Sequence, residues 1–146
     1  MDHSPAYILV QHLISEGEVS APTSSGSWPS YVGVLPDHDT VEDNAVAVMD
    51  TAPVKDGRIM GGSPLFHDGI QILIRSSAYN TGFSKASDLA AALAAIDDSE
   101  IEVESGSTYN LASITQITGV ISLGQEPGTK RRYQFSVNFL ATIQEV

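Results

Sequence analysis

The run between Gly69 and Arg75 constrains what this chain can fold into more than any other stretch. Ile70, Ile72 and Ile74 occupy alternate positions of it, so their side chains lie on one face of an extended strand. β-Branched side chains suit a pleated surface. A strand this apolar is usually central in a sheet and covered on both faces. We therefore predict a central strand from Gly69 to Arg75.

Two segments have the spacing of amphipathic helices. Ser4 and Pro5 suit the cap and the first position of a helix, and Gly17 is a suitable C-terminal stop. The second helix is expected from about Ser84 to Asp97, where an alanine-rich stripe can lie close to a sheet.

Six further stretches read as strands, at residues 31–35, 44–51, 101–104, 109–111, 114–123 and 132–143. A hairpin is the simplest connection between the first two. The last has the strongest alternation of the chain and would span roughly 40 Å. Because that exceeds a typical strand, one hypothesis is that part of it projects past its own sheet and pairs with a neighbour.

The segment from Ala52 to Asp68 contains Pro and Gly at several positions and is expected to be a long loop. Such loops are often functional or disordered. This one also carries apolar side chains that a purely solvated loop would not need. Two readings remain open, an arm that orders against a partner and a loop that folds back on its own core.

These elements predict an α+β fold with one domain over residues 1–146. The expected architecture is a mostly antiparallel or mixed β-sheet with two helices packed on it. A long loop is expected between the second and third strands.

Composition narrows the function classes. The chain has 146 residues, a formal net charge of −11 and no cysteine, so no disulfide or thiolate chemistry is expected. The negative charge argues against non-specific binding to nucleic acid and to anionic membranes. No signal peptide and no spanning segment is recognised, so we expect no membrane association and assembly in the cytoplasm.

No motif for nucleophilic, phosphate-binding or dinucleotide chemistry appears. No catalytic residue, metal site or cofactor is predicted, and the chain is not expected to be an enzyme. The residues that most resemble a metal cluster are Asp37, His38 and Asp39, with His67 and Asp68. Their spacing fits no metal motif, so two solvated turns are the preferred interpretation. A small metal-dependent enzyme remains the alternative from another class.

One ordered set of segments carries a family resemblance. An N-terminal helix comes first, and a second helix separates the third segment from the fourth. The segments are 28–37 (WPSYVGVLPD), 44–51 (NAVAVMDT), 67–75 (HDGIQILIR) with Tyr79 nearby, and 123–126 (LGQE) leading to 132–139 (RYQFSVNF). In this order the chain resembles the tail terminator proteins of long-tailed bacteriophages, also called minor capsid or tail completion proteins. His67-Asp68-Gly69 stands where the family pattern has His-Pro-Gly.

The resemblance implies a structural virion protein in the neck region of the tail. Such proteins form a ring, usually a hexamer, on the head-proximal end of the tail tube. The ring ends tube polymerisation, docks to the head connector and leaves an open channel through which DNA passes without specific binding. The runner-up within this class is another head-to-tail joining protein or a tail tube subunit.

The resemblance and the residues together suggest where subunits and tube would be contacted. The Ala52–Asp68 segment and the final strand are expected to carry these contacts, and Arg75 or Arg131 is expected to pair with an acid of a neighbouring subunit. The 130–132 cluster could pair with acids of another subunit or contact a phosphate backbone, but a charged hairpin tip that blunts a sheet edge is the preferred interpretation. The interface candidates are Lys55, Arg58, Ile59, Met60, Leu65, Phe66, Arg75, Lys130, Arg131 and Arg132.

Overall fold

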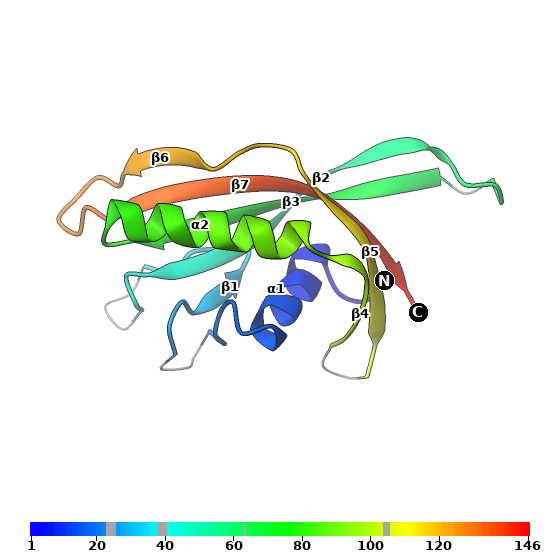
Figure 1. Ribbon diagram of the computed structural model, residues 1–146, viewed down its shortest axis with the longest axis horizontal. Helices are drawn as coiled ribbons and strands as arrows, with labels where there is room; N and C mark the ends of the chain where they lie inside the picture. Colours follow the sequence, from blue (N-terminus) through cyan, green and yellow to red (C-terminus); the bar gives the residue numbers. More distant parts are fainter. Residues whose placement is uncertain (23–25, 38–40, 63, 104–105) are drawn as a thin grey trace.

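The computed structural model describes residues 1–22, 26–37, 41–62, 64–103 and 106–146. Within these residues the chain forms two α-helices and seven β-strands in a curled, mixed sheet (Figure 1). In chain order the elements are α1 (Pro5–Ser15), β1 (Ser30–Val32), β2 (Ala45–Arg58), β3 (Pro64–Ser76), α2 (Tyr79–Ala94), β4 (Asp97–Glu102), β5 (Thr108–Gln116), β6 (Ile121–Gln125) and β7 (Tyr133–Glu145). The predicted α+β class is confirmed, with β-structure predominating.

The strand order of the sheet is β1-β2-β3-β7-β5-β4, and β6 pairs with β7 alongside the end of β5. β1 runs parallel to β2, whereas the other neighbours are antiparallel. The expected hairpin between the first two strands is therefore wrong, because strands joined by a hairpin run antiparallel.

The predicted central strand is confirmed, since β3 lies between β2 and β7. Ile70, Ile72 and Ile74 are all 0% exposed. Their side chains share one apolar core with the buried residues of α1, α2 and β7. Full burial of one such side chain contributes roughly 1.5–3 kcal/mol, so this face of β3 supplies a large part of the stability of the core.

The last strand is also found where it was predicted, with Phe135, Val137 and Phe139 buried. β3 pairs with one edge of β7 as far as Ala141, while β6 and β5 pair with the other edge. The hypothesis that β7 projects past its own sheet is therefore wrong. Strands of the same chain hold nearly its whole length.

The first helix begins as the sequence predicts. Ser4 is the N-cap, Pro5 is the first helical residue, and the Ser4 Oγ accepts a hydrogen bond of 3.2 Å from the Tyr7 backbone N–H. The helix ends at Ser15, and Gly17 follows with a φ of +75°. Glycine adopts that conformation without steric cost.

The second helix starts at Tyr79, before the predicted cap Ser84. The Ser76 Oγ accepts from the Ala78 N–H at 3.2 Å immediately ahead of it. The early start places Gly82 against the Phe135 ring of β7, where an added Cβ would lie 2.6 Å from a ring carbon. This close approach could not be predicted from the sequence, because glycine disfavours a helix interior.

The strands between α2 and β7 are displaced from their predicted bounds. The break expected near residues 112–113 falls at 117–120 instead, between β5 and β6. There the Ile117 N–H donates to the Asn138 carbonyl at 2.9 Å, and the Thr118 Oγ accepts from the Asn138 N–H at 3.2 Å. At this break the Asn138 N–H bonds to a side chain, where a regular ladder would offer it a backbone carbonyl. The end of the strand predicted at 101–104 lies outside the described residues.

The expected long loop is wrong. β2 continues to Arg58 and β3 begins at Pro64, so most of the Ala52–Asp68 segment is strand (Figure 1). Pairing shifts register between Thr51 and Val54 and again between Lys55 and Arg58. These β-bulges accommodate residues that break a regular alternation.

Candidate interaction surfaces

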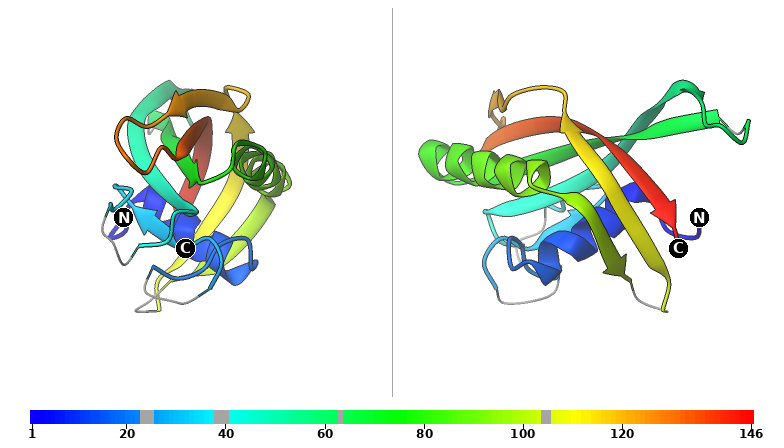
Figure 2. Two further views of the ribbon diagram at one scale, coloured as in Figure 1. Left: turned by 90° about the vertical axis from the view of Figure 1, so that its left-hand side faces the viewer. Right: turned by 45° about the vertical axis from the view of Figure 1, so that its right-hand side comes forward.

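We use "the arm" for residues 52–62 and 64–67, the part of the β2–β3 hairpin that extends away from the rest of the sheet (Figures 1 and 2). Within the arm the two strands pair with each other, as at Lys55 and Phe66. β7 pairs with β3 only from Asp68 onward. In the described part of the chain the arm is therefore a two-stranded ribbon whose outer edges have no strand partner.

The arm presents apolar side chains to solvent. Val54, Ile59 and Phe66 are about half exposed, at 47%, 51% and 47%, and Met60 is fully exposed. None of the described arm residues is buried, so the reading of a loop that folds back on its own core is wrong. A lone two-stranded ribbon is marginally stable in water, and clustered exposed apolar groups mark interaction sites. The arm thus has the character of a surface made for contact.

The base of the arm is fixed to the sheet. A Cβ at Gly69 would clash with the Thr51 hydroxyl oxygen and would lie 2.5 Å from the Ala52 carbonyl oxygen, so glycine lets β3 lie close to β2 beside the bulge that follows Thr51. Just beyond, His67 Nδ1 lies 2.8 Å from the Thr142 Oγ of β7, and Nε2 lies 3.1 Å from the Asp56 Oδ2. These contacts set the direction in which the arm leaves the body.

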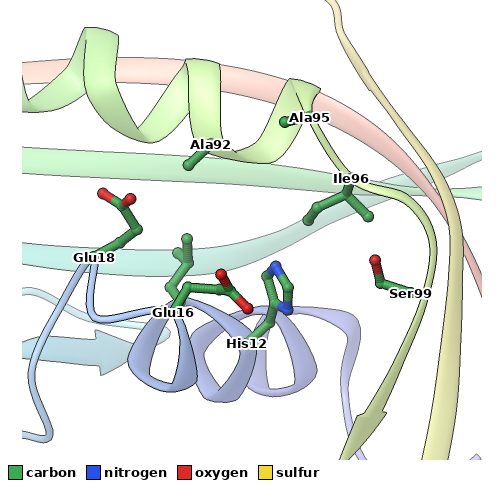
Figure 3. Close-up of a pocket in the computed structure, with 8 residues that line it drawn as sticks. His12, Glu16, Glu18, Ala92, Ala95, Ile96 and Ser99 are labelled. Carbon is green, nitrogen blue, oxygen red and sulfur yellow. The ribbon is translucent and has the colours of Figure 1, made fainter.

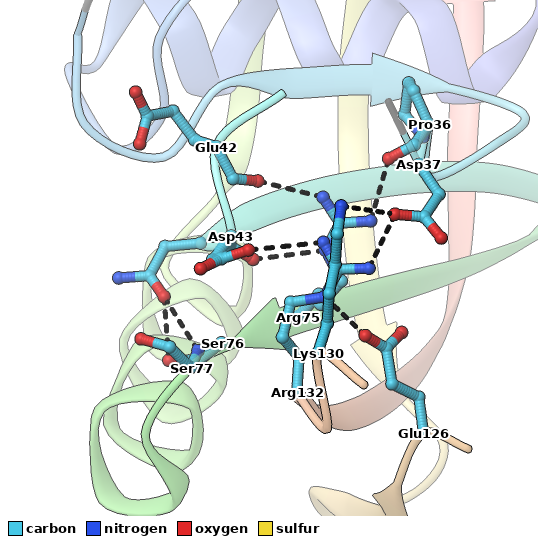
Figure 4. Close-up of polar contacts among 11 residues, drawn as sticks. Pro36, Asp37, Glu42, Asp43, Arg75, Ser76, Ser77, Glu126, Lys130 and Arg132 are labelled. Carbon is cyan, nitrogen blue, oxygen red and sulfur yellow. Dashed lines mark hydrogen bonds and ion pairs between the residues drawn. The ribbon is translucent and has the colours of Figure 1, made fainter. Parts of the chain in front are cut away.

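Two arginines are buried together where β3 ends and β7 begins, at the end of the sheet away from the arm (Figure 4). The Arg132 side chain is 1% exposed. It donates to Glu126 through Nε, to Asp37 at 2.8 Å and to Asp43 at 3.4 Å. Burial alone would lower the pKa of Arg132, but hydrogen bonds to Glu126 and Asp37 raise it above its ordinary value. The guanidinium is therefore permanently charged and paired.

Arg75 is held differently, by backbone carbonyls (Figure 4). Its guanidinium donates to the carbonyls of Asp43 at 3.1 Å, Pro36 at 2.8 Å and Glu42 at 2.9 Å. Burial, and then the positive charge of Arg132, lower the pKa of Arg75. The planar fork of arginine satisfies three buried acceptors at once. Arg75 thereby fastens the chain on both sides of residues 38–40 to the sheet.

This arrangement argues against two of the interface candidates. Arg75 and Arg132 are 1% exposed, and every hydrogen bond described for their side chains is made within the subunit. They are not free to pair with an acid of a neighbouring subunit. Their role is internal, because unpaired buried charges are strongly destabilising.

Lys130 and Arg131 lie in the turn between β6 and β7. Lys130 pairs with Asp37 at 3.1 Å and is partly exposed. Arg131 is exposed, has a φ of +47°, and accepts a hydrogen bond from the Gln125 side chain only through its carbonyl. The other six candidates, Lys55, Arg58, Ile59, Met60, Leu65 and Phe66, lie together in the arm. The arm and this turn project at opposite ends of the molecule (Figure 1).

A cavity of about 270 Å³ lies between the ends of the two helices and the start of β4 (Figure 3). His12, Glu16 and Glu18 line it from the first helix and the segment after it, opposite Ile96 and Ser99. Burial lowers the pKa of His12, and Glu16 opposes that shift. The described lining lacks a nucleophile–base pair in hydrogen-bond contact, so its geometry does not indicate catalysis.

The metal alternative cannot be built from the described residues. His38 and Asp39 lie outside them, while Asp37 is bound to Arg132 and Lys130. His67 contacts Thr142 and Asp56. Among the described residues no group of three or more His, Cys, Asp or Glu side chains is placed to hold a metal ion.

No described helix has both the length and the apolar character needed to cross a membrane. Neither a protein-family model nor a curated protein matches this chain.

Proposed function

We propose that this chain is a structural virion protein that forms a ring at the head-proximal end of a phage tail tube, ends tube polymerisation and joins the tail to the head connector. The observation that carries the proposal is the arm, a two-stranded ribbon with exposed apolar side chains and unpaired outer edges. A ring of identical subunits needs a heterologous interface, in which one surface of each copy contacts a different surface of the next. A projecting ribbon can supply one half of such an interface by adding strands to a neighbour.

The charge of the chain supports the same proposal. A ring that passes DNA through its bore must not bind the phosphate backbone. The formal net charge of −11 gives DNA a repulsive wall rather than an adhesive one. The ring is expected to be a hexamer, with the tail tube protein and a connector protein as its partners.

Deletion of the arm tip tests the proposal. A variant in which residues 55–65 are replaced by a two-residue Asn-Gly turn should keep its near-ultraviolet circular dichroism, because no described residue of that segment is buried. It should fail to form rings in negative-stain images and fail to limit tail length in an assembly assay. A matched control replaces the exposed surface residues Ser84 and Asp88 of α2 by alanine and should assemble normally.

Rings that persist without the arm would show that the arm does not carry the ring contacts, and natural protein that forms no ring would contradict the proposal. The assay also separates the neighbouring functions within this class. A tail tube subunit would stack into tubes of open length, and another joining protein would form a ring that leaves tail length unchanged. A terminator adds one ring and stops growth.

A further inference from the structure

The arm differs in charge from the remainder of the chain. It carries Lys55 and Arg58 but only one acid, Asp56, so it is formally +1. Because the whole chain carries −11, the remainder carries −12. The described structure gives Lys55 no hydrogen bond or ion pair, and the Arg58 side chain donates only to the Gly62 carbonyl at the arm tip. The arm therefore offers two cations to an outside partner.

An acidic counterpart lies on the strand at one border of the sheet. β4 ends the strand order, and among the described strands β5 is its one partner. Its sequence, DDSEIE, contains four acids, and all four are exposed. None of the ion pairs among the described residues includes Asp97, Glu100 or Glu102.

The register of β4 shows which acids face outward. Ile101 is buried opposite the buried Tyr109, so this side of the strand faces the core. Glu100 and Glu102 flank Ile101 and lie on the other side of the strand. Among the described residues no strand pairs with the outer backbone edge of β4, which is bordered by two carboxylates that point away from the core.

We propose that the arm of one copy docks along the free edge of β4 in a second copy, with Lys55 and Arg58 opposite Glu100 and Glu102. This inference rests on the proposed ring and names the surface that receives the arm. Backbone hydrogen bonds between the two free edges supply affinity, and the charges select the pairing. Two β4 strands repel each other, so the acids also prevent the competing contact between identical edges.

The free edge of β6 is the competing receiver. All five of its residues are exposed, and Ile121 and Leu123 are apolar. It lies at the end of the molecule opposite the arm (Figure 1). β6 offers no carboxylate of its own to Lys55 and Arg58, so charge complementarity favours β4.

A charge exchange tests the docking. Lys55→Glu with Arg58→Glu, or Glu100→Lys with Glu102→Lys, should each raise the concentration needed for assembly by about tenfold or more. The combination of all four should restore assembly, and it has the net charge of the natural chain. Light scattering after size-exclusion chromatography gives the mass, and negative stain gives the shape. Glu42→Lys with Asp88→Lys is the matched control and should assemble normally.

Crosslinking gives a second readout that does not depend on charge. The chain contains no cysteine, so Arg58→Cys and Glu100→Cys proteins can be mixed and oxidised with copper phenanthroline. A disulfide-linked heterodimer is expected, and an Asp88→Cys partner should give none. Loss of assembly in Leu123→Asp together with normal assembly of the β4 reversal would overturn the inference in favour of β6.

The outcomes separate the two proposals. If the natural protein and the β4 charge-reversal variant both form rings, the docking is refuted and the proposed ring stands. If the four-residue exchange restores assembly but the particles are dimers or filaments, the docking is supported and the ring is refuted. Natural protein that stays monomeric at every concentration, without crosslinking, would refute both.

Discussion

At the scale of single residues, Arg75 and Arg132 solve one problem in two ways. Both are buried at the same end of the sheet. Arg75 uses neutral carbonyls, so it brings in no counter-charge. Arg132 uses carboxylates, and Glu126 and Asp37 balance the positive charge of the pair. Together they fasten two connecting segments whose sequences have little apolar material of their own.

Gly82 provides a test of packing against helix propensity. Alanine stabilises an exposed helix interior by about 1 kcal/mol relative to glycine. At Gly82, however, the added Cβ would lie 2.6 Å from the Phe135 ring and 2.9 Å from the Ser76 Cβ. We expect Gly82→Ala to lower the free energy of unfolding by about 1–3 kcal/mol, measured by urea denaturation. Ser84→Ala, at an exposed position of the same helix, should change it by no more than about 0.5 kcal/mol.

The Asp37 pairing predicts a dependence of stability on pH. Hydrogen bonds from Arg132 and then Lys130 lower the pKa of Asp37 to about 2. Because the folded-state pKa lies below the unfolded one, the pairing stabilises the fold above about pH 4 and is lost as pH falls through 2. Asp37→Asn should therefore be less stable than the natural chain at pH 6, and the difference should shrink between about pH 4 and pH 2. Urea denaturation across this range measures it.

Asp2→Asn serves as the control, because Asp2 is exposed and has no ion pair among the described residues. A difference between Asp37→Asn and the natural chain that stays constant down to pH 2 would show that the charge of Asp37 does not contribute.

At the scale of elements, the sequence predicts the strands that have one face buried in the core. The alternation of Ile70, Ile72 and Ile74 identifies β3, and that of Phe135 to Phe139 identifies β7, because each has one face in the core. Ser4 and Pro5 identify α1 because their capping chemistry is local. These features depend on neighbours in the chain, so a pattern reveals them.

The arm could not be predicted as strand for the opposite reason. Its residues have no core to face, so no alternation of apolar and polar types is imposed on them, and two bulges disrupt the register further. Pro53, Gly57 and Gly61 are also typical of loops. The arginine cluster was missed because its members come from segments far apart in the sequence. The one available signal was Arg75 itself, a long cation at the end of a buried strand.

Hydrogen exchange should distinguish the arm from the rest of the hairpin. In the free subunit, amides between Val54 and Arg58 should exchange much faster than those between Ile70 and Ile74, because the arm has no core beneath it. In the assembled ring the arm amides should become protected, while the β3 core amides stay slow in both states. Arm amides that remain fast after assembly would show that the arm makes no strand contact.

At the scale of the whole molecule, charge is divided rather than spread evenly. Most of the acids lie on the body, Lys55 and Arg58 lie on the arm, Arg131 is exposed in the turn between β6 and β7, and the buried arginines are neutralised internally. If the arm is engaged by a neighbour, the assembled surface is left mostly negative. Assembly would then weaken any binding of a polyanion such as DNA, because it covers the exposed cations of the arm.

This division makes DNA binding a test of the assembled state. We expect the natural protein at micromolar concentration to leave the mobility of duplex DNA unchanged in gel electrophoresis at about 50 mM salt, where phosphate contacts are strongest. The four-residue exchange keeps the net charge but moves the two cations to β4, and it should behave in the same way once it assembles. Retardation that weakens steeply with salt in the natural protein, and that disappears in Lys55→Glu with Arg58→Glu, would show instead that the arm contacts the phosphate backbone. The arm would then be a nucleic-acid contact, and the bore of the ring would lose its proposed electrostatic role.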